Sequence, residues 1–258
     1  MLAPLLRGGA ASDARGYFAD SRRPLEILFF LLPFIALYEY ELARVLRSAD
    51  GLVTNGAHLG ILRVFAALGL GEGALSVPGI LIVVILLVWH ALERRPWIVD
   101  LSVVARMFGE SLGLAVPLLV FSQIAVRALP AAGVADFGAL PLDARIAVSI
   151  GAGLYEELVF RMALLALLQG LLGDVLGLPP RAAVACAVGL GAIAFAGYHP
   201  LHDAQGAIIA QRAVFYLGAG VYFGVVYLQR GFGVVVATHA LYDIATAFLV
   251  GAPTDAAP

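Results

Sequence analysis

The chain has few charged residues, no lysine and a single cysteine. Only 13% of its 258 residues are charged, whereas soluble domains carry roughly 25%. Hydrophobic residues make up 62% of the chain, and its mean hydropathy is +0.95. This composition excludes an ordinary soluble domain and predicts an integral membrane protein.

The scarcity of basic residues and of cysteine excludes two further classes of site. The formal net charge is −2, and the arginines occur singly or in pairs, so there is no basic run to follow a phosphate backbone. We therefore expect no nucleic-acid partner. One cysteine cannot build a disulfide framework or a cysteine-ligated metal site within one chain. Cys186 lies between alanines, and we expect it to be a buried, unreactive thiol.

Several signatures of intramembrane proteolysis are missing as well. There is no H-E-x-x-H zinc motif and no G-x-S-x-G nucleophile elbow. The stretch "LLGD" (residues 171 to 174) lacks the first glycine of the G-x-G-D motif that marks paired aspartates of the presenilin type. Serine and paired-aspartate chemistry are both disfavoured.

Long apolar runs dominate what is present. About 20 apolar residues cross a bilayer as a helix, and we predict an all-α, polytopic transmembrane helix bundle of about seven to eight spanning helices. A shorter run at 58–70 contains Arg63, so we expect it to be interfacial or a buried half-helix, and it leaves an eighth crossing open. The predicted spans are 24–44, 75–92, 108–128, 145–172, 182–200, 212–229 and 231–250.

The distribution of arginine indicates an orientation. The pairs at 22–23 and 94–95 flank predicted spans, and the positive-inside rule places both in the cytoplasm. Arg44 and Arg47 then fall on the outer side, against the rule. We expect a multi-pass protein of a prokaryotic plasma membrane with a cytoplasmic N-terminus. The expected organisation is a cytoplasmic segment over 1–23, N-terminal membrane helices over 24–140, a membrane core over 141–250 and a flexible tail over 251–258.

Ionisable residues inside spanning helices cost about 2.5 to 3.5 kcal/mol each on insertion scales and mark function by default. Three predicted helices carry such residues, and each set has members four residues apart, which places them on one helix face. The sets lie in "EELVFR" (156–161), "FAGYH" (195–199) and "HALYD" (239–243).

The two adjacent glutamates are expected to have different roles. Arg161 follows Glu157 by four residues, the favourable order for an ion pair on a helix. Glu156 is then left without a cation and is suited to accept a proton from water as a general base. The alternative is an ion pair that holds helices together, with a spare glutamate facing a water-filled cavity.

The histidines are predicted to meet these glutamates at different depths. Glu156 precedes Asp174 by 18 residues and His199 follows Arg181 by 18, so a hairpin at 174–181 brings Glu156 and His199 to one depth. His239 lies nine residues beyond Arg230, about 14 Å along a helix against roughly 27 Å for the other two. To bring it to the same site, either the turn at 174–181 projects further from the membrane than the turn at 229–233, or the helices tilt.

Asp243 follows His239 by one helical turn, and two roles stay open for it. Its carboxylate can orient the imidazole, or its protonated form can hold a substrate carbonyl. The alternative for the pair is again structural, as a buried His–Asp contact between helices.

Together the three stretches resemble the CPBP family of CAAX proteases and bacteriocin-processing enzymes, also called the Abi or Ras-converting-endopeptidase-like family. They match Glu-Glu-x-x-x-Arg, Phe-x-x-x-His and His-x-x-x-Asn/Asp in the right order, and the resemblance covers about 145–250. It implies an all-helical intramembrane endopeptidase that hydrolyses hydrophobic or lipidated peptides or proteins, in contact with membrane lipid. The catalytic residues it implies are Glu156 as the water-activating base, Glu157 and Arg161 as its support, and His199, His239 and Asp243.

Two of the family's properties cannot be assigned directly to this sequence. The third motif ends in Asp243, where the prenyl-protein-processing members are expected to have Asn. Two histidines and a glutamate also suffice for a catalytic zinc, so a metal-dependent enzyme would use Glu156, His199 and His239. Their spacing is not a zinc signature, and we favour metal-free chemistry, with either no cofactor or one divalent metal such as zinc.

Two other classes of function remain open at this point. Intramembrane Glu, His and Asp residues also serve proton relays in transporters and channels. A recognisable inverted repeat is missing, and all three motifs lie in the C-terminal half, which both disfavour a transporter. A non-catalytic membrane scaffold of the same fold is the third alternative.

Overall fold

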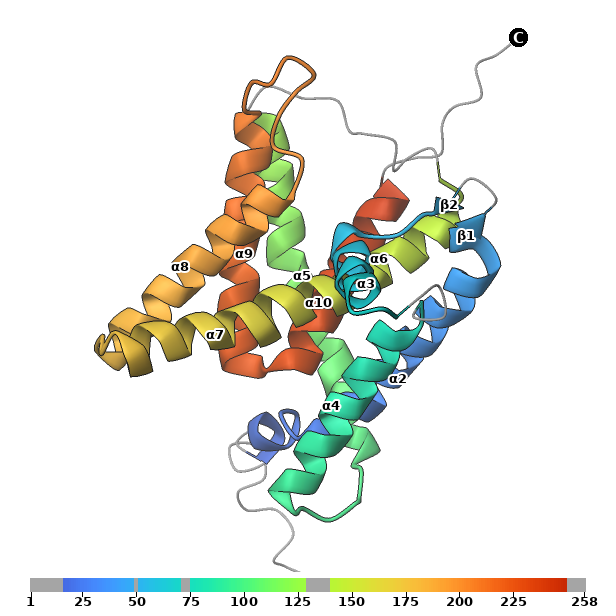
Figure 1. Ribbon diagram of the computed structural model, residues 1–258, viewed down its shortest axis with the longest axis vertical. Helices are drawn as coiled ribbons and strands as arrows, with labels where there is room; N and C mark the ends of the chain where they lie inside the picture. Colours follow the sequence, from blue (N-terminus) through green and yellow to red (C-terminus); the bar gives the residue numbers. More distant parts are fainter. Residues whose placement is uncertain (1–15, 49–50, 71–74, 129–139, 250–258) are drawn as a thin grey trace, which may run out of the picture.

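The computed structural model describes residues 16–48, 51–70, 75–128 and 140–249. These residues form an all-helical bundle (Figure 1), which confirms the predicted fold class. Residues 1–15 of the expected N-terminal segment, residues 49–50, 71–74 and 129–139 of the expected N-terminal membrane helices, residue 250 of the expected core and the tail over 251–258 lie outside the described residues.

Each of the seven predicted spans is a helix. Two π-helical stretches interrupt the fourth, and two-residue strands β1 (Arg47–Ser48) and β2 (Gly51–Leu52) pair in an antiparallel hairpin after the first. The α-helices are α2 (Pro24–Glu41), α3 (Gly56–Ala67), α4 (Val77–Glu93), α5 (Leu101–Ala128), α6 (Leu142–Glu157), α7 (Leu165–Gln169), α8 (Pro180–Tyr198), α9 (Ala210–Arg230) and α10 (Phe232–Leu249), and the π-helices are η1 (Leu42–Leu46), η4 (Leu158–Leu164) and η5 (Gly170–Val175).

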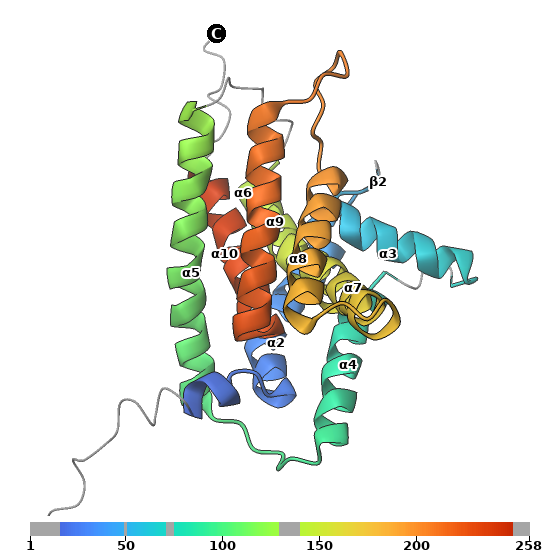
Figure 2. The same cartoon turned by 90° about the vertical axis from the view of Figure 1, so that its left-hand side faces the viewer.

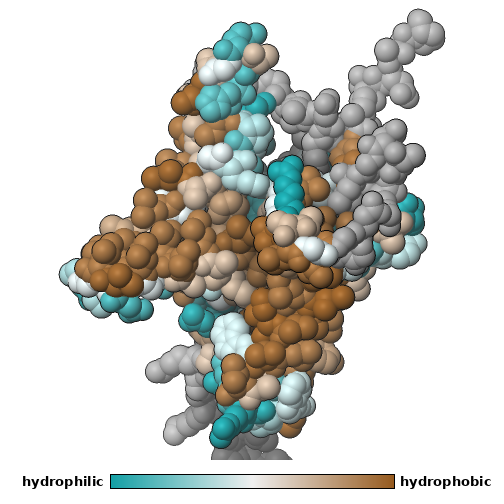
Figure 3. Space-filling view, viewed as in Figure 1, coloured by the Kyte–Doolittle hydropathy of each residue, from teal (hydrophilic) through white to brown (hydrophobic). Residues whose placement is uncertain are grey.

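Three described helical stretches are long and apolar enough to cross a bilayer, namely Leu101–Ala125, Leu142–Val175 and Pro180–Tyr198. Helices α3, α4 and most of α10 are apolar but shorter. Hydrophobic side chains cover the surface over α4, α7 and α8, while hydrophilic ones gather mainly at the ends of the molecule (Figure 3). The protein is therefore an integral membrane protein, and the full number of crossings stays a prediction.

Helices α6 and α10 pack together at the centre of the bundle with little space between their backbones. A Cβ atom on Gly153 would lie 2.7 Å from the carbonyl oxygen of Val236 and 2.9 Å from the Cβ of Ala240. Only glycine permits this approach, because any larger residue would push the helices apart. The close contact places the glutamates at the end of α6 opposite His239 on α10.

The run from α6 through α7 to η5 crosses the long axis of the molecule obliquely (Figure 1). Helices α5 and α9 instead lie along that axis (Figure 2). Because α6 is inclined relative to α5 and α9, each of its residues advances less along the long axis. The same number of residues from a turn therefore corresponds to different depths in different helices. This inclination removes the mismatch expected for His239.

The short helix α3 agrees with the expected half-helix. The Asn55 side chain caps it by accepting a hydrogen bond of 2.8 Å from the backbone N–H of His58. His58 is fully buried, whereas Leu68 at the far end is 72% exposed. The helix thus begins inside the bundle and projects away from it (Figure 2).

The expectation of a buried cysteine is wrong, because Cys186 is exposed on α8. Its apolar surroundings in the sequence suggested a protein core. The outer face of a helix in a bilayer contacts lipid instead, so an apolar sequence there does not require burial against protein.

Candidate active site

The structure brings all six candidate residues into one cluster, drawn from three regions of the chain. Glu156 and Glu157 end α6, and Arg161 lies in η4 directly after them. His199 is the C-cap residue of α8, and His239 and Asp243 lie one turn apart on α10.

Glu156 lies between the two imidazoles. Its Oε2 atom is 3.7 Å from Nε2 of His199 and 3.9 Å from Nε2 of His239. Glu156 is only 5% exposed, and its Oε2 atom makes no hydrogen bond to any described residue. Separations of this length are those that one bridging water spans, so the carboxylate and both imidazoles can share a water molecule.

Glu157 instead has close polar partners on both sides. Its Oε2 atom is 3.1 Å from Nε of Arg161, and its Oε1 atom is 2.7 Å from Nδ1 of His239. The predicted Glu157–Arg161 ion pair is therefore present, and the structure adds a contact with His239 that spacing along one helix does not predict.

His199 is oriented by the end of its own helix. Its Nδ1–H donates a hydrogen bond of 2.8 Å to the carbonyl oxygen of Phe195, one turn earlier. This carbonyl is one of the groups that a helix C-terminus leaves without a backbone partner. Because Nδ1 carries the proton, Nε2 keeps its lone pair and faces Glu156.

His239 has an acidic group near each ring nitrogen. Nδ1 faces Glu157, and Nε2 lies 3.4 Å from Oδ2 of Asp243. An imidazolium ion has two N–H donors, and both would find acceptors here. The arrangement favours the orienting role for Asp243 over the alternative in which its protonated carboxyl holds a substrate carbonyl.

Aromatic rings fix the cluster in place. His199 stacks on Tyr216 at 3.9 Å between ring centroids, and His239 stacks on Phe223 at 4.4 Å. The Arg161 guanidinium lies 4.3 Å from the Phe195 ring. Such packing limits the rotamers of the charged side chains and excludes water from around the ion pair.

Tyr198 is a site residue that the sequence reasoning missed. Its hydroxyl donates to Oε1 of Glu156 at 3.5 Å. Its place beside His199 in "FAGYH" was the only signal in the sequence that pointed to it. Tyr216 and Phe223 gave no signal, because aromatic residues are common on any membrane helix.

Tyr155, which precedes the two glutamates, belongs to a second polar group behind them. Its ring stacks on His58 at 4.5 Å, and its hydroxyl donates to Glu39 at 3.3 Å. The side chain is fully buried. It connects α6 to α2 and α3 and does not contact the histidines of the cluster through any hydrogen bond described.

Access to the cluster is uneven. The side chains of Glu157 and Arg161 are 0% and 3% exposed, whereas those of His199 and Asp243 are 15% and 27% exposed. A substrate therefore meets His199 and Asp243 first, with Glu156 behind them and the Glu157–Arg161 pair deepest.

The metal alternative rests on Glu156, His199 and His239. Over the described ranges, no group of three His, Cys, Asp or Glu side chains is positioned to hold a metal ion. Glu156, His199 and His239 do converge, but one His239 nitrogen faces Glu157 and the other lies near Asp243.

The fold and this cluster define a class: a helical membrane protein with a buried carboxylate facing two imidazoles. Residues 139–245 match the family model described as type II CAAX prenyl endopeptidase Rce1-like. The match confirms the resemblance carried by the three motifs. It covers less than half of the chain. Neither a curated protein nor a solved structure shows significant similarity to it.

Proposed function

We propose that the protein hydrolyses a peptide bond of a hydrophobic or lipidated substrate, with Glu156 as the general base. The observation that carries this proposal is the position of Glu156 Oε2, which is buried, without a hydrogen bond to any described residue, and faces both imidazoles at 3.7 and 3.9 Å. A carboxylate placed in this way can accept a proton from a water held between the three side chains.

The first step is attack of water on the peptide carbonyl. The water oxygen bonds to the carbonyl carbon, one water proton passes to Glu156, and the second water proton is held by Nε2 of His199. The carbonyl oxygen becomes an oxyanion. His239, as an imidazolium whose Nδ1–H is held by Glu157, turns its Nε2–H from Asp243 to that oxyanion.

The second step is collapse of the tetrahedral intermediate. The carbonyl re-forms, the C–N bond breaks, and protonated Glu156 donates its proton to the leaving nitrogen. The products are a carboxylic acid, which keeps the second water proton, and an amine, and Glu156 returns to its starting state; the acid then loses that proton to solvent. Arg161 takes no proton in this scheme, because its role is to balance the charge of Glu157.

The substrate class follows from the family and from the surroundings of the site. The matching family is described as CAAX prenyl endopeptidases, which supports a lipid-modified peptide as the substrate. The hydrophobic surface of the helices around the cluster suits a substrate that arrives through the membrane (Figure 3). The orientation with a cytoplasmic N-terminus in a prokaryotic plasma membrane is part of the same proposal.

The test compares the termini of membrane proteins in cells that carry wild-type protein or Glu156→Gln. We expect specific new termini in the wild type alone, and purified wild-type protein in liposomes should cleave peptides that span those sites. Asp174→Asn is the matched control, because it removes an exposed carboxylate outside the cluster. Equal cleavage by wild type and Glu156→Gln would overturn the proposal.

Two further measurements distinguish the proposed metal-free hydrolysis from a metal-dependent enzyme and from a transporter. Cleavage in the liposome assay should persist after treatment with a chelator, and loss of activity that zinc restores would contradict the metal-free step. Proton flux through the same liposomes, lost in Glu156→Gln without any cleavage by the wild type, would instead favour a transporter.

A further inference from the structure

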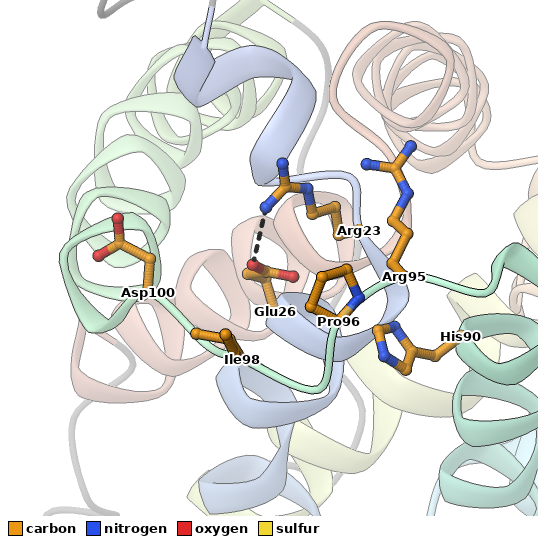
Figure 4. A pocket seen from close by; sticks show the side chains of 7 residues that line it. All are labelled: Arg23, Glu26, His90, Arg95, Pro96, Ile98 and Asp100. Atoms are coloured by element: carbon orange, nitrogen blue, oxygen red, sulfur yellow. Dashed lines mark ion pairs between the residues drawn. The ribbon is translucent and has the colours of Figure 1, made fainter.

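A pocket of about 320 Å³ lies at the end of the bundle where α2 begins and α4 ends. Figure 4 shows the side chains of Arg23 and Arg95 on one side of it, with Glu26 next to Arg23 and His90 from α4 next to Pro96. A second pocket lies alongside and shares both arginines. This end of the molecule is separate from the candidate active site, and none of its residues has a role in the proposed hydrolysis.

Two buried side chains in this pocket have polar atoms without hydrogen bonds to the described residues. His90 is 2% exposed, and neither of its ring nitrogens has such a partner. Glu26 is 1% exposed, and its Oε1 atom makes no hydrogen bond to the described residues. The nearby Nη1 atom of Arg23 is 3.6 Å away, which is too far for a hydrogen bond. A buried polar atom left without a hydrogen bond destabilises the fold, and a charged group does so more. Both groups face the pocket, so a ligand with polar hydrogens can satisfy them.

The charges around the pocket are mixed. Three arginines line the two pockets, and carboxylates lie among them: Arg22, Arg23 and Arg95 against Asp20, Glu26, Glu93 and Asp100. Hydrogen bonds from Ser102 hold the pKa of Asp100 below its usual range, so that carboxylate stays ionised. Since the four carboxylates outnumber the three arginines, the site does not select a purely anionic ligand. It suits one that carries both an anion and a cation.

The chain is shaped locally to close this pocket. Arg94, the C-cap of α4, has a φ angle of 52°, a left-handed conformation that non-glycine residues adopt at a cost of about 1 to 2 kcal/mol. It turns the chain so that Arg95 and Pro96 return across the pocket. Trp97 then packs against the His90 ring, with 4.5 Å between ring centroids.

The surroundings indicate that the ligand comes from the membrane. Trp89 is 40% exposed and lines the second pocket, while Trp97 and Ile98 are 62% and 74% exposed. Tryptophan is enriched where a bilayer meets water. Exposed apolar side chains beside a mixed-charge pocket match a molecule with a charged headgroup and acyl chains.

From these contacts we infer that the pocket binds the headgroup of a phosphoethanolamine lipid. The phosphate lies between the guanidinium groups of Arg23 and Arg95, which are suited to phosphate oxygens. The primary ammonium donates to Glu26 Oε1 and to a ring nitrogen of His90. A phosphocholine headgroup has the same charges but no N–H group, so it cannot satisfy either atom.

The inference is tested first on the unmodified protein. Full-length protein is placed in nanodiscs of phosphatidylglycerol with an equal share of one test lipid, and the lipid retained after transfer to detergent is measured by native mass spectrometry. Phosphatidylethanolamine and its N-methyl form both keep two N–H groups for the two acceptors and should be retained about equally, and retention should then fall stepwise through the N,N-dimethyl form to phosphatidylcholine. One lost hydrogen bond to a charged group corresponds to about tenfold in affinity. Equal retention of the four lipids, or tighter retention of phosphatidylglycerol than of all of them, would overturn it.

Two variants then assign the headgroup contacts. Glu26→Gln and His90→Gln should each lower the preference for phosphatidylethanolamine over phosphatidylcholine about tenfold. The control is His202→Gln, since His202 is exposed in the α8–α9 loop, and it should keep the wild-type preference. A preference unchanged in both pocket variants would place the lipid elsewhere and contradict the inference. Soluble phosphoethanolamine should displace the lipid only weakly; displacement as effective as by the lipid itself would show that the ligand is the free headgroup.

Discussion

Glu157 contacts His239 across the helix interface, with 2.7 Å between Oε1 and Nδ1, while its other oxygen pairs with Arg161 at 3.1 Å. One buried carboxylate thus links the arginine of the first motif to the histidine of the third. The pair beside the proposed base is consequently part of the positioning of His239 as well as a helix-stabilising contact.

Removing the arginine of this pair should destabilise the fold. Arg161→Met leaves Glu157 as a buried charge without its cation, and breaking a buried pair in this way costs about 3 to 5 kcal/mol. The double variant Glu157→Gln with Arg161→Met should recover part of that loss. The free energy of unfolding in mixed micelles measures both effects. Arg63→Met, at an exposed position on α3, is the control, and an equal cost for the two arginines would contradict the prediction.

The Tyr198 hydroxyl should increase the rate of peptide hydrolysis without affecting substrate binding. Tyr198→Phe removes one hydrogen bond to Glu156, which is worth about 1 kcal/mol, or about fivefold in rate. We expect kcat to fall by that factor with KM unchanged. Tyr222→Phe is a matched control because the Tyr222 hydroxyl donates to the Leu114 carbonyl at 2.6 Å instead. A drop in kcat of the same size in both variants would mean that the effect is only structural.

Substitution of Asp243 distinguishes its two possible roles. If it orients His239, Asp243→Asn keeps an oxygen near Nε2 and should retain most of the activity, while Asp243→Ala should lose about tenfold or more. If it donated a proton to the oxyanion, Asp243→Asn would be more active than wild type at high pH, because an amide N–H needs no protonation. Activity of the three proteins across a range of pH values decides between these outcomes.

The close approach of α6 and α10 should be intolerant of added volume. Gly153→Ala places a Cβ 2.7 Å from the Val236 carbonyl oxygen, and overpacking of this kind costs about 1 to 3 kcal/mol. It should also separate Glu156 from His239 and lower activity. Gly109→Ala on α5 meets nothing within 4 Å and should be neutral or stabilising, since alanine favours helix. Thermal unfolding of the two variants gives the comparison, and equal shifts would contradict it.

Much of the fold was readable from the sequence, because apolar runs and Gly/Pro breaks mark membrane helices strongly. The six polar positions of the cluster were readable too, since charged residues are rare inside such helices. The contacts between individual atoms of the cluster could not be predicted from the sequence, because they depend on the inclination of α6 and on the close helix approach at Gly153. Cys186 was misplaced for a related reason: an apolar sequence does not distinguish a protein core from a lipid-facing surface. The roles of Glu156, His199 and the other site residues stay predictions until activity is measured.

The stretch from Leu142 to Val175 has 34 residues, which makes it about 51 Å long as a continuous helix. The hydrocarbon core of a bilayer is only about 30 Å thick, so this helix cannot stand upright and stay within it. The inclination that brings Glu156 to His239 is therefore the same inclination that fits an overlong helix to its membrane. Bilayer thickness and the geometry of the candidate active site are linked through a single structural element.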